Sequence, residues 1–322
     1  MRAAVYRRYG PPGVVEVEDV PRPSPGPNDL LIRVRATTVS TADWRIRSLS
    51  MPRGFGFAGR LAFGFSAPRQ RILGSELAGD VVFVGAAVRS FAVGDAVIAV
   101  PGVEFGAHAE YCCVNSGSSV AKKPERLSYP VAAALAFGGS TALDFFRRGK
   151  LRAGERVLIN GASGTVGSAM VQIAVAFGAE VTAVCSDANR ECMQQLGARR
   201  VVDYATSDFA AEGIRYDVIV DTVGNAPYSR VREALTAGGR LLLVLATLPQ
   251  LLHAPWLDLT TTHRVFAGPA AQRLDDLHTL VAMAAAGRFT PLIDCCLPLD
   301  RIAAAHARVE SGRKRGSVVV EP

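Results

Sequence analysis

Long apolar runs are absent from this chain of 322 residues. The longest one begins at Leu241 and is cut by Pro249, well short of the roughly 18–20 residues that a bilayer span needs. The first residues, MRAAVYRRYGPP, contain no apolar segment of the kind found in secretory signal peptides. These absences predict a cytoplasmic protein with no membrane partner.

Paired C-x-x-C motifs are absent as well. The six cysteines occur as Cys112-Cys113, Cys295-Cys296 and the separate Cys185 and Cys192. Adjacent cysteines are poor disulfide partners, so all six are interpreted as reduced thiols, most of them buried. The spacing excludes zinc ribbons and thioredoxin-like motifs.

Acidic residues are fewer than basic ones, which gives a net charge of +7. Such a charge can indicate a nucleic-acid partner, but the basic residues are scattered and only residues 313–315 form a tight cluster. A polyanionic cofactor explains the charge more simply, so a nucleic-acid partner is disfavoured.

Two sequence patterns divide the chain. The first 120 or so residues hold short apolar alternations such as LLIRVRAT and GDAVIAV between glycines and prolines, which predicts a small β-barrel. From Leu127, a predicted helix at about 130–148 comes first and strands then alternate with helices, which predicts a parallel, doubly wound sheet. The tail contains predicted helices at about 274–286 and 301–311 and ends in SVVVE, a strand typical of the barrel. We therefore expect one domain from 1–124, completed by about 265–322, and a second from 125–264.

Residues 51–71 combine several phenylalanines with few acids. This composition suits a loop or short helix that faces the substrate, or equally one that covers the barrel core.

The stretch NGASGTVGSA lies between the predicted strand RVLIN and a helix that begins near Val166. Ala162, Gly164 and Gly167 occupy the three small-residue places of a dinucleotide-binding fingerprint. Small residues let the backbone approach a pyrophosphate, and the helix N-terminus attracts the anion, so a phosphate cradle is favoured over a flexible turn. The cradle is predicted to comprise Gly161, Ala162, Ser163, Gly164, Thr165, Val166 and Gly167.

The end of the second predicted strand favours NADPH over NADH. An acidic residue there would bind the ribose hydroxyls of NAD. The strand EVTAVCS ends at Ser186, however, and Asp187 lies two residues beyond the position at which the fingerprint places that acid. Ser186, Arg190 and Tyr204 are candidates to contact a 2′-phosphate. Asp187 is the counter-argument, because its carboxylate would repel that phosphate.

Several motifs together resemble the medium-chain dehydrogenase/reductase superfamily from end to end, namely ILGSELAGDVVFVG, FAVGDAVIAV, GAHAEY, LAFGGSTALDF, VLINGASGTVG and ESGRKRGSVVV. They are most similar to its zinc-independent quinone oxidoreductase branch. The resemblance implies an α/β fold with a GroES-like β-barrel catalytic domain and a Rossmann domain, and often a homodimer.

The resemblance also bears on metal. Zinc-dependent members have a cysteine where this chain has Ser40 and a histidine where it has Ser75, and hydroxyls are not usual zinc ligands. Without a Lewis acid, hydride transfer needs an acceptor that is already electrophilic, so a quinone or an activated alkene is expected.

The same resemblance supplies the other site candidates. Near the substrate they are Ser40, Asp43, Trp44 and Arg45, although Asp43 could instead pair with a nearby arginine in a structural role. Further cofactor-binding candidates are Thr141, Val223, Leu245, Ala246, Phe266, Gly268 and Lys314. His108 and His306 are expected to be structural.

Two other functions stay open. An NADP-linked alcohol dehydrogenase or carbonyl reductase is the alternative enzyme. A protein that binds NADPH without turnover, as a sensor or as an RNA-binding relative, is the alternative from another class.

Overall fold

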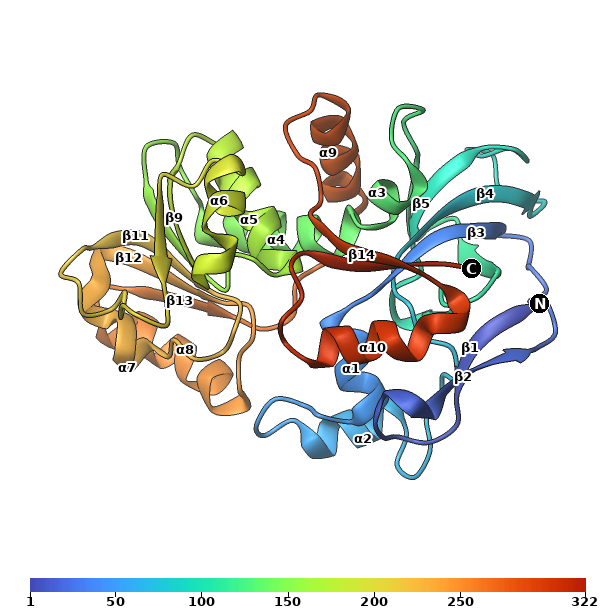
Figure 1. Cartoon of the computed structure of the whole chain (residues 1–322), viewed down its shortest axis with the longest axis horizontal. Coiled ribbons are helices and arrows are strands. Elements are labelled where there is room, and N and C mark those ends of the chain that lie inside the picture. The colour runs from blue at the N-terminus through green and yellow to red at the C-terminus, as the bar shows by residue number, and fades with distance from the viewer. The chain divides into compact units, whose positions relative to one another are not determined.

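The computed structural model describes all 322 residues, which form two compact units (Figure 1). Unit 1 comprises Met1–Met51, Gly56–Phe137 and Gln272–Pro322, and unit 2 comprises Pro52–Phe55 and Gly138–Ala271. None of the helices combines the length and the apolar character that crossing a membrane requires.

Unit 1 is built on a seven-stranded sheet in the order β14-β15-β3-β4-β5-β7, with β6 also paired to β3, and a separate β1-β2 ribbon. Its elements are β1 (Arg2–Tyr6), β2 (Val15–Asp19), β3 (Asp29–Val39), α1 (Thr41–Ser48), α2 (Gly56–Phe63), β4 (Leu77–Val84), β5 (Ala96–Val100), β6 (Tyr111–Asn115), β7 (Ser119–Lys122), α3 (Tyr129–Ala133), α9 (Leu274–Ala285), β14 (Ile293–Pro298), α10 (Ile302–Glu310) and β15 (Ser317–Glu321). All the pairings of the larger sheet are antiparallel except β14 with β15.

The tail of the chain completes this unit. Val318, Val319 and Val320 of β15 are fully buried and pair in register with Val39, Thr38 and Thr37 of β3. Three consecutive β-branched residues suit a strand that is covered on both faces. The expectation that SVVVE returns to the barrel is confirmed.

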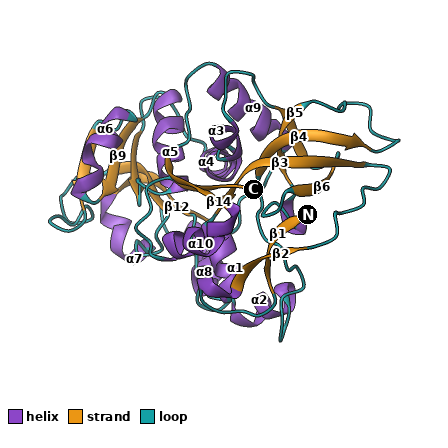
Figure 2. Cartoon of the chain, turned by 45° about the vertical axis from the view of Figure 1, so that its right-hand side comes forward, coloured by secondary structure: helices purple, strands orange, loops and turns teal.

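Unit 2 is a six-stranded parallel sheet in the order β10-β9-β8-β11-β12-β13. Its elements are α4 (Ala136–Gly149, which begins at the boundary between the units), β8 (Arg156–Asn160), α5 (Thr165–Ala176), β9 (Glu180–Cys185), α6 (Arg190–Gln195), β10 (Arg200–Asp203), β11 (Tyr216–Asp221), α7 (Tyr228–Val231), β12 (Leu235–Leu243), α8 (Leu248–Thr260) and β13 (Arg264–Ala267). Helices flank both faces of this sheet (Figure 2), which is the doubly wound arrangement predicted from the alternating pattern.

Three features differ from the sequence-based expectations. The helical stretch after Leu127 is two helices, α3 and α4, separated at Ala134 and Leu135. The apolar run from Leu241 is the end of strand β12 followed by helix α8, which was not predicted. The cysteines are all free, as expected, but only Cys112 and Cys185 are buried.

Candidate functional site

The turn between β8 and α5 has the geometry of a phosphate cradle. Gly161 has a φ of +81°, which disfavours residues with a side chain, and an added Cβ would lie only 2.6 Å from Val223 Cγ2. The amides of Gly161 and Ala162 both donate to Val184 O of the neighbouring strand, at 3.1 and 3.0 Å. The first residues of the turn are therefore fixed against the sheet.

Gly164 begins helix α5 as its N-cap and leaves the end of the helix open. It contributes no side-chain hydrogen bond to the first turn, whose amides lack intrahelical acceptors in any α-helix. A Cβ added at Gly164 would meet only Gly161 O, at 3.6 Å. No side chain at this position therefore blocks the approach of an anion, which the helix dipole would attract.

Gly167 has a different role. A Cβ there would overlap Gly161 O and lie 2.7 Å from Ala162 Cα. Glycine lets α5 pack directly on the turn that precedes it. Gly138 of α4 makes a similar close approach, because its Cβ would lie 2.8 Å from Thr165 O.

The other predicted cofactor residues of unit 2 gather at one edge of the sheet, apart from Thr141, which lies within α4. Because all six strands are parallel, their carboxyl ends share this edge. The residues are Ser186 after β9, Tyr204 after β10, Val223 after β11, Leu245 and Ala246 after β12, Phe266 within β13 and Gly268 just beyond it. The edge also holds a pocket of about 330 Å³, whose lining includes Asn160, Tyr204 and Arg230.

Arg190 is already engaged. Its Nε lies 2.6 Å from Asp187 Oδ1, and its Nη1 donates to Val201 O at 3.1 Å. The hydroxyl of Ser186 accepts from Asn189 Nδ2 at 3.0 Å. The Asp187 carboxylate, which would repel a 2′-phosphate, is therefore paired with the Arg190 guanidinium, which would attract one.

Asp221 is a residue of this edge that the sequence analysis did not single out. It is fully buried at the end of β11, and its Oδ1 accepts from Asn160 Nδ2 at 3.0 Å and from Gly224 N at 2.9 Å. Oδ2 accepts from Ala226 N at 2.8 Å. The carboxylate shapes the loop that carries Val223. An acid at the end of a largely apolar strand was the signal available in the sequence.

In unit 1, Ser40 and Asp43 form a capping box at the start of α1. Asp43 Oδ2 accepts from Ser40 N at 2.8 Å and from Ser40 Oγ at 2.6 Å, and the Asp43 amide donates back to Ser40 Oγ at 3.2 Å. Asp43 Oδ1 accepts from Gly74 N at 3.0 Å. The arginine pairing considered for Asp43 is not formed, because serine and backbone donors occupy its carboxylate.

Trp44 and Arg45 lie side by side in α1, with the Arg45 guanidinium 5.0 Å from the centre of the Trp44 ring. Arg45 Nη1 donates to Ser50 O at 2.9 Å, and burial lowers the pKa of this side chain. Trp44 Nε1 and Arg45 Nε are buried donors with no partner. Unpaired buried donors lower the stability of the fold.

Glu76 is a further residue missed from the sequence, although it stands inside the motif GSELAG. It is 1% exposed, and burial raises its pKa to about 7, against hydrogen bonds from Thr38 Oγ1 and from Phe137 N that lower it. The Phe137 amide lies 2.6 Å from Oε2. A carboxyl group with such a pKa exchanges a proton near neutral pH.

Lys314, the cofactor candidate in the tail, belongs to unit 1. Burial lowers the pKa of its ammonium group to about 8, against the charges of Asp294 and Glu76. Its Nζ donates to Gly316 O at 2.7 Å.

No group of three or more histidine, cysteine, aspartate or glutamate side chains is arranged to hold a metal ion. Ser40 and Ser75, which stand where zinc-dependent proteins have ligands, are both buried.

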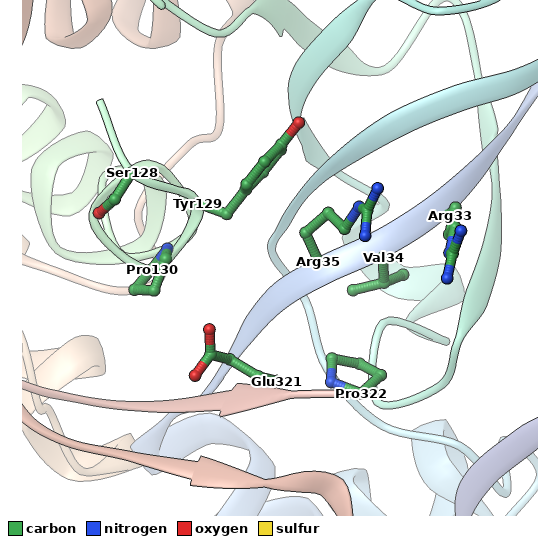
Figure 3. A pocket seen from close by; sticks show the side chains of 8 residues that line it. All are labelled: Arg33, Val34, Arg35, Ser128, Tyr129, Pro130, Glu321 and Pro322. Carbon is green, nitrogen blue, oxygen red and sulfur yellow. The ribbon is translucent and has the colours of Figure 1, made fainter. Parts of the chain in front are cut away.

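A second pocket, of about 460 Å³, lies in unit 1 and contains none of the predicted site residues (Figure 3). Its lining includes Arg33, Arg35, Tyr129 and Glu321. Arg35 is paired with Asp80 at 2.7 Å, and the charges of the lining oppose one another. We assign no ligand to it.

Both parts of the chain match families of known dehydrogenases. The alcohol dehydrogenase GroES-like domain matches residues 26–125, and the zinc-binding dehydrogenase family matches residues 196–320. The chain is 30% identical to the chloroplast envelope quinone oxidoreductase homolog of Arabidopsis thaliana, over 100% of this chain and 98% of the relative. It is 29% identical to the 2-methylene-furan-3-one reductase of Solanum lycopersicum, over 100% of this chain and 79% of the relative.

Solved structures give the same result. The quinone oxidoreductase from Coxiella burnetii superposes with a TM-score of 0.89 at 27% identity, covering 100% of this chain and 99% of the other. The mycobacterial Rv1454c protein, solved in complex with NADPH, superposes with a TM-score of 0.83 at 25% identity, covering 100% of both chains.

Proposed function

Since the chain belongs to the medium-chain dehydrogenase/reductase superfamily, in its quinone oxidoreductase-like branch, we propose that it reduces a quinone or an activated alkene, with NADPH as the hydride donor and without zinc. It is an oxidoreductase of the GroES-like and Rossmann type. A nicotinamide cofactor agrees with its relatives, which include NAD(P)H oxidoreductases.

The observation that carries the proposal is the set of side chains in unit 1 that stand where zinc ligands would be expected. Ser40 donates its hydroxyl hydrogen to Asp43, and no cluster of metal-ligating side chains replaces the missing cysteine and histidine. Support for the acceptor comes from relatives named for quinones and for a furanone that carries an activated alkene.

The nicotinamide ring supplies the hydride when the cofactor is bound. The residues of this chain would bind the cofactor, orient the acceptor and donate hydrogen bonds to it. The first-turn amides of α5 would hold the pyrophosphate, because Gly164 has no side chain to block them. Trp44 Nε1 and Arg45 Nε are offered as donors to the carbonyl oxygen of the acceptor, where negative charge develops.

Acceptor-dependent oxidation of NADPH tests this function. The purified chain should consume NADPH with 1,2- or 1,4-quinones or with an enone, and a chelator should leave the rate unchanged. Elemental analysis should find well under one zinc per chain. The proposal is wrong if zinc is stoichiometric and the chelator abolishes turnover. Faster oxidation of an alcohol with NADP⁺ would favour the alternative enzyme. Tight NADPH binding without turnover of any acceptor would favour the sensor.

The preference for NADPH is a separate proposal, and it rests on Ser186, Arg190 and Tyr204. A charged hydrogen bond is worth about 1.5–3 kcal/mol, so the Arg190→Ala variant should lose roughly ten- to a hundredfold in NADPH affinity and little in NADH affinity. Asp187→Asn is the matched variant. It removes the carboxylate that holds Arg190 at 2.6 Å and should strengthen NADPH binding. Fluorescence titration with both nucleotides measures these effects, and equal wild-type affinities would contradict the preference.

A homodimer is proposed on the surface of unit 2. Leu252, Trp256 and Leu259 are 70%, 55% and 86% exposed along one side of α8, and β13, against which α8 packs, is an edge strand of the sheet. An exposed apolar stripe beside an open strand edge is typical of subunit interfaces. A monomer in sedimentation velocity at micromolar concentration would contradict it.

A cytoplasmic location also stays a proposal. The relatives are named for chloroplasts and mitochondria, and that location is theirs. Fractionation of the source cells with an antibody to this chain decides the matter.

A further inference from the structure

We propose that unit 1 docks on the surface of an anionic lipid bilayer through the segment around α2. The docking surface consists of Phe57, Leu61, Phe65, Arg60, Arg69 and Arg71, and is called the α2 patch below. This inference does not depend on the acceptor proposed above.

Three large apolar side chains of the α2 patch face solvent. Phe57, Leu61 and Phe65 are 69%, 58% and 59% exposed. Phe57 and Leu61 are four residues apart, and this spacing places them on one face of α2. The ring of Phe65 meets that of Phe57 edge to face, with centroids 6.0 Å apart. Together they form a continuous apolar ridge rather than scattered exposed residues.

The opposite face of α2 is anchored to the unit. A Cβ added at Gly59 would lie 2.7 Å from Met51 Cγ, so the helix backbone packs closely on that side chain. Phe63 packs against the hydrophobic core of unit 1, and Tyr9 Oη donates to Gly64 O at 2.8 Å. The ridge is therefore presented by a fixed helix.

The charges beside the ridge are of one sign. Arg60, Arg69 and Arg71 are exposed, and none of them forms an ion pair, whereas arginines such as Arg7 and Arg308 do. Arg60 and Arg69 donate only to the backbone carbonyls of Phe65 and Ala62, at 2.8 and 3.4 Å. Residues 51–71 contain no acidic side chain at all. The arginines of the patch therefore carry positive charge that no ion pair neutralises.

An anionic bilayer complements both properties. Headgroup phosphates pair with arginines at the surface while phenylalanine and leucine enter the boundary of the acyl chains. The α2 patch of a second copy of the chain does not complement these properties, because two such patches would bring only positive charges together. A nucleic acid fits the arginines, but it leaves Leu61 in water and needs the Phe57–Phe65 ring contact to open for stacking. Surface docking needs no spanning segment, so the absence of one, on which the expectation of no membrane partner rested, does not exclude it.

Vesicle co-sedimentation tests the proposal. The full chain should sediment with vesicles of phosphatidylcholine containing about a third phosphatidylglycerol, but not with pure phosphatidylcholine, and binding should weaken as salt is raised. Removing two charges in Arg69→Gln/Arg71→Gln should lower the partition coefficient roughly twenty- to thirtyfold, at about fivefold for each arginine. Phe57→Ser/Leu61→Ser/Phe65→Ser should lose more than tenfold.

Matched variants outside the patch serve as controls. Arg301→Gln/Arg313→Gln removes the same charge from exposed positions, and Val93→Ser/Val103→Ser removes apolar side chains that are 68% and 86% exposed. Both should bind vesicles within about twofold of the unsubstituted chain. Circular dichroism confirms that every variant is folded.

Three outcomes overturn the proposal. The first is equal binding of the patch variants and their controls. The second is tight binding of a labelled single-stranded oligonucleotide that the α2 patch variants lose, with no vesicle binding. The third is a change of association state in the triple-serine variant during sedimentation velocity without vesicles, which would make the patch an interface between copies.

Discussion

We expect the Gly164→Val variant to lose NADPH affinity by about a hundredfold or more while the chain stays folded. The wild-type backbone at this N-cap, with φ −76° and ψ 175°, is extended and open to valine. An added Cβ would meet only Gly161 O, at 3.6 Å. The branched side chain instead fills the space in front of the α5 amides. Losing two charged hydrogen bonds of about 1.5–3 kcal/mol each accounts for the expected effect.

Gly167→Ala is the paired variant, with the opposite expectation. Its Cβ would overlap Gly161 O and crowd Ala162 Cα, so the helix must shift at a cost of about 1–3 kcal/mol in stability. Cofactor fluorescence titration and thermal unfolding, measured on both variants, separate the two roles. If Gly164→Val binds NADPH normally, the turn is not the cradle and the oxidoreductase assignment loses its structural support.

The second large effect is expected in the dependence of stability on pH, and it arises from His306 and Glu76. His306 of α10 is fully buried, and neither of its ring nitrogens has a hydrogen-bond partner. Burial, together with the nearby His108 ring and the Arg47 guanidinium, lowers the pKa of His306 well below its usual range. Arg47 is itself paired with Glu310 at 2.7 Å.

The signs of the two contributions differ. Below about pH 6.5 and above the lowered native pKa of His306, the unfolded chain binds this proton and the native state does not, so stability falls as the pH falls, by up to about 1.4 kcal/mol for each pH unit. Glu76, whose pKa rises from 4.5 to about 7 in the native state, stabilises the fold fully below pH 4.5. That contribution is lost as the pH rises through 7, on the order of 3 kcal/mol in all. Below pH 6.5 the two contributions therefore change stability in opposite directions.

Single substitutions should expose each slope. The His306→Leu variant should become less stable as the pH rises from 4.5 to 6.5, and Glu76→Gln should become more stable over the same range. Urea unfolding at constant ionic strength measures both. The chain has two tryptophans, so a Trp256→Phe background makes Trp44 fluorescence a reporter of unit 1 alone. Curves parallel to that of the background chain would show that neither group titrates as described.

Local patterns were sufficient to predict the parallel sheet. Strands such as RVLIN and YDVIVD have apolar centres and alternate with helices, and the small residues from Gly161 to Gly167 have roles that follow from backbone geometry alone. The return of SVVVE to the barrel was also predictable, because three consecutive valines suit a covered strand.

Other elements gave no local signal. Helix α8 contains Pro249 and Pro255, which are read as breakers in a sequence, yet Pro249 stands in the first turn, where proline is tolerated. Strand β14 contains Cys295 and Cys296 without alternation, and it forms because β15 offers it a parallel edge. The break between α3 and α4 falls in an alanine-rich stretch with no glycine or proline to mark it.

The candidate site was predictable only where backbone atoms, rather than side chains, would contact the ligand. Glu76 and Asp221 appear in the sequence as acids within largely apolar stretches, and their importance depends on burial and on partners distant in the chain. The engagement of Arg190 by Asp187 likewise depends on side-chain geometry, which neither composition nor spacing determines.

The position of β15 in the sheet has a consequence for how the protein is made. This strand lies between β14 and β3, yet the ribosome synthesises it after the whole of unit 2. Apart from Pro52–Phe55, unit 2 is one continuous segment from Gly138 to Ala271. Its sheet can therefore assemble before β15 has been synthesised and paired with β3. During translation that edge is a nascent-chain surface exposed to chaperones and to other unfinished copies, until β15, which follows unit 2 in the chain, pairs with it.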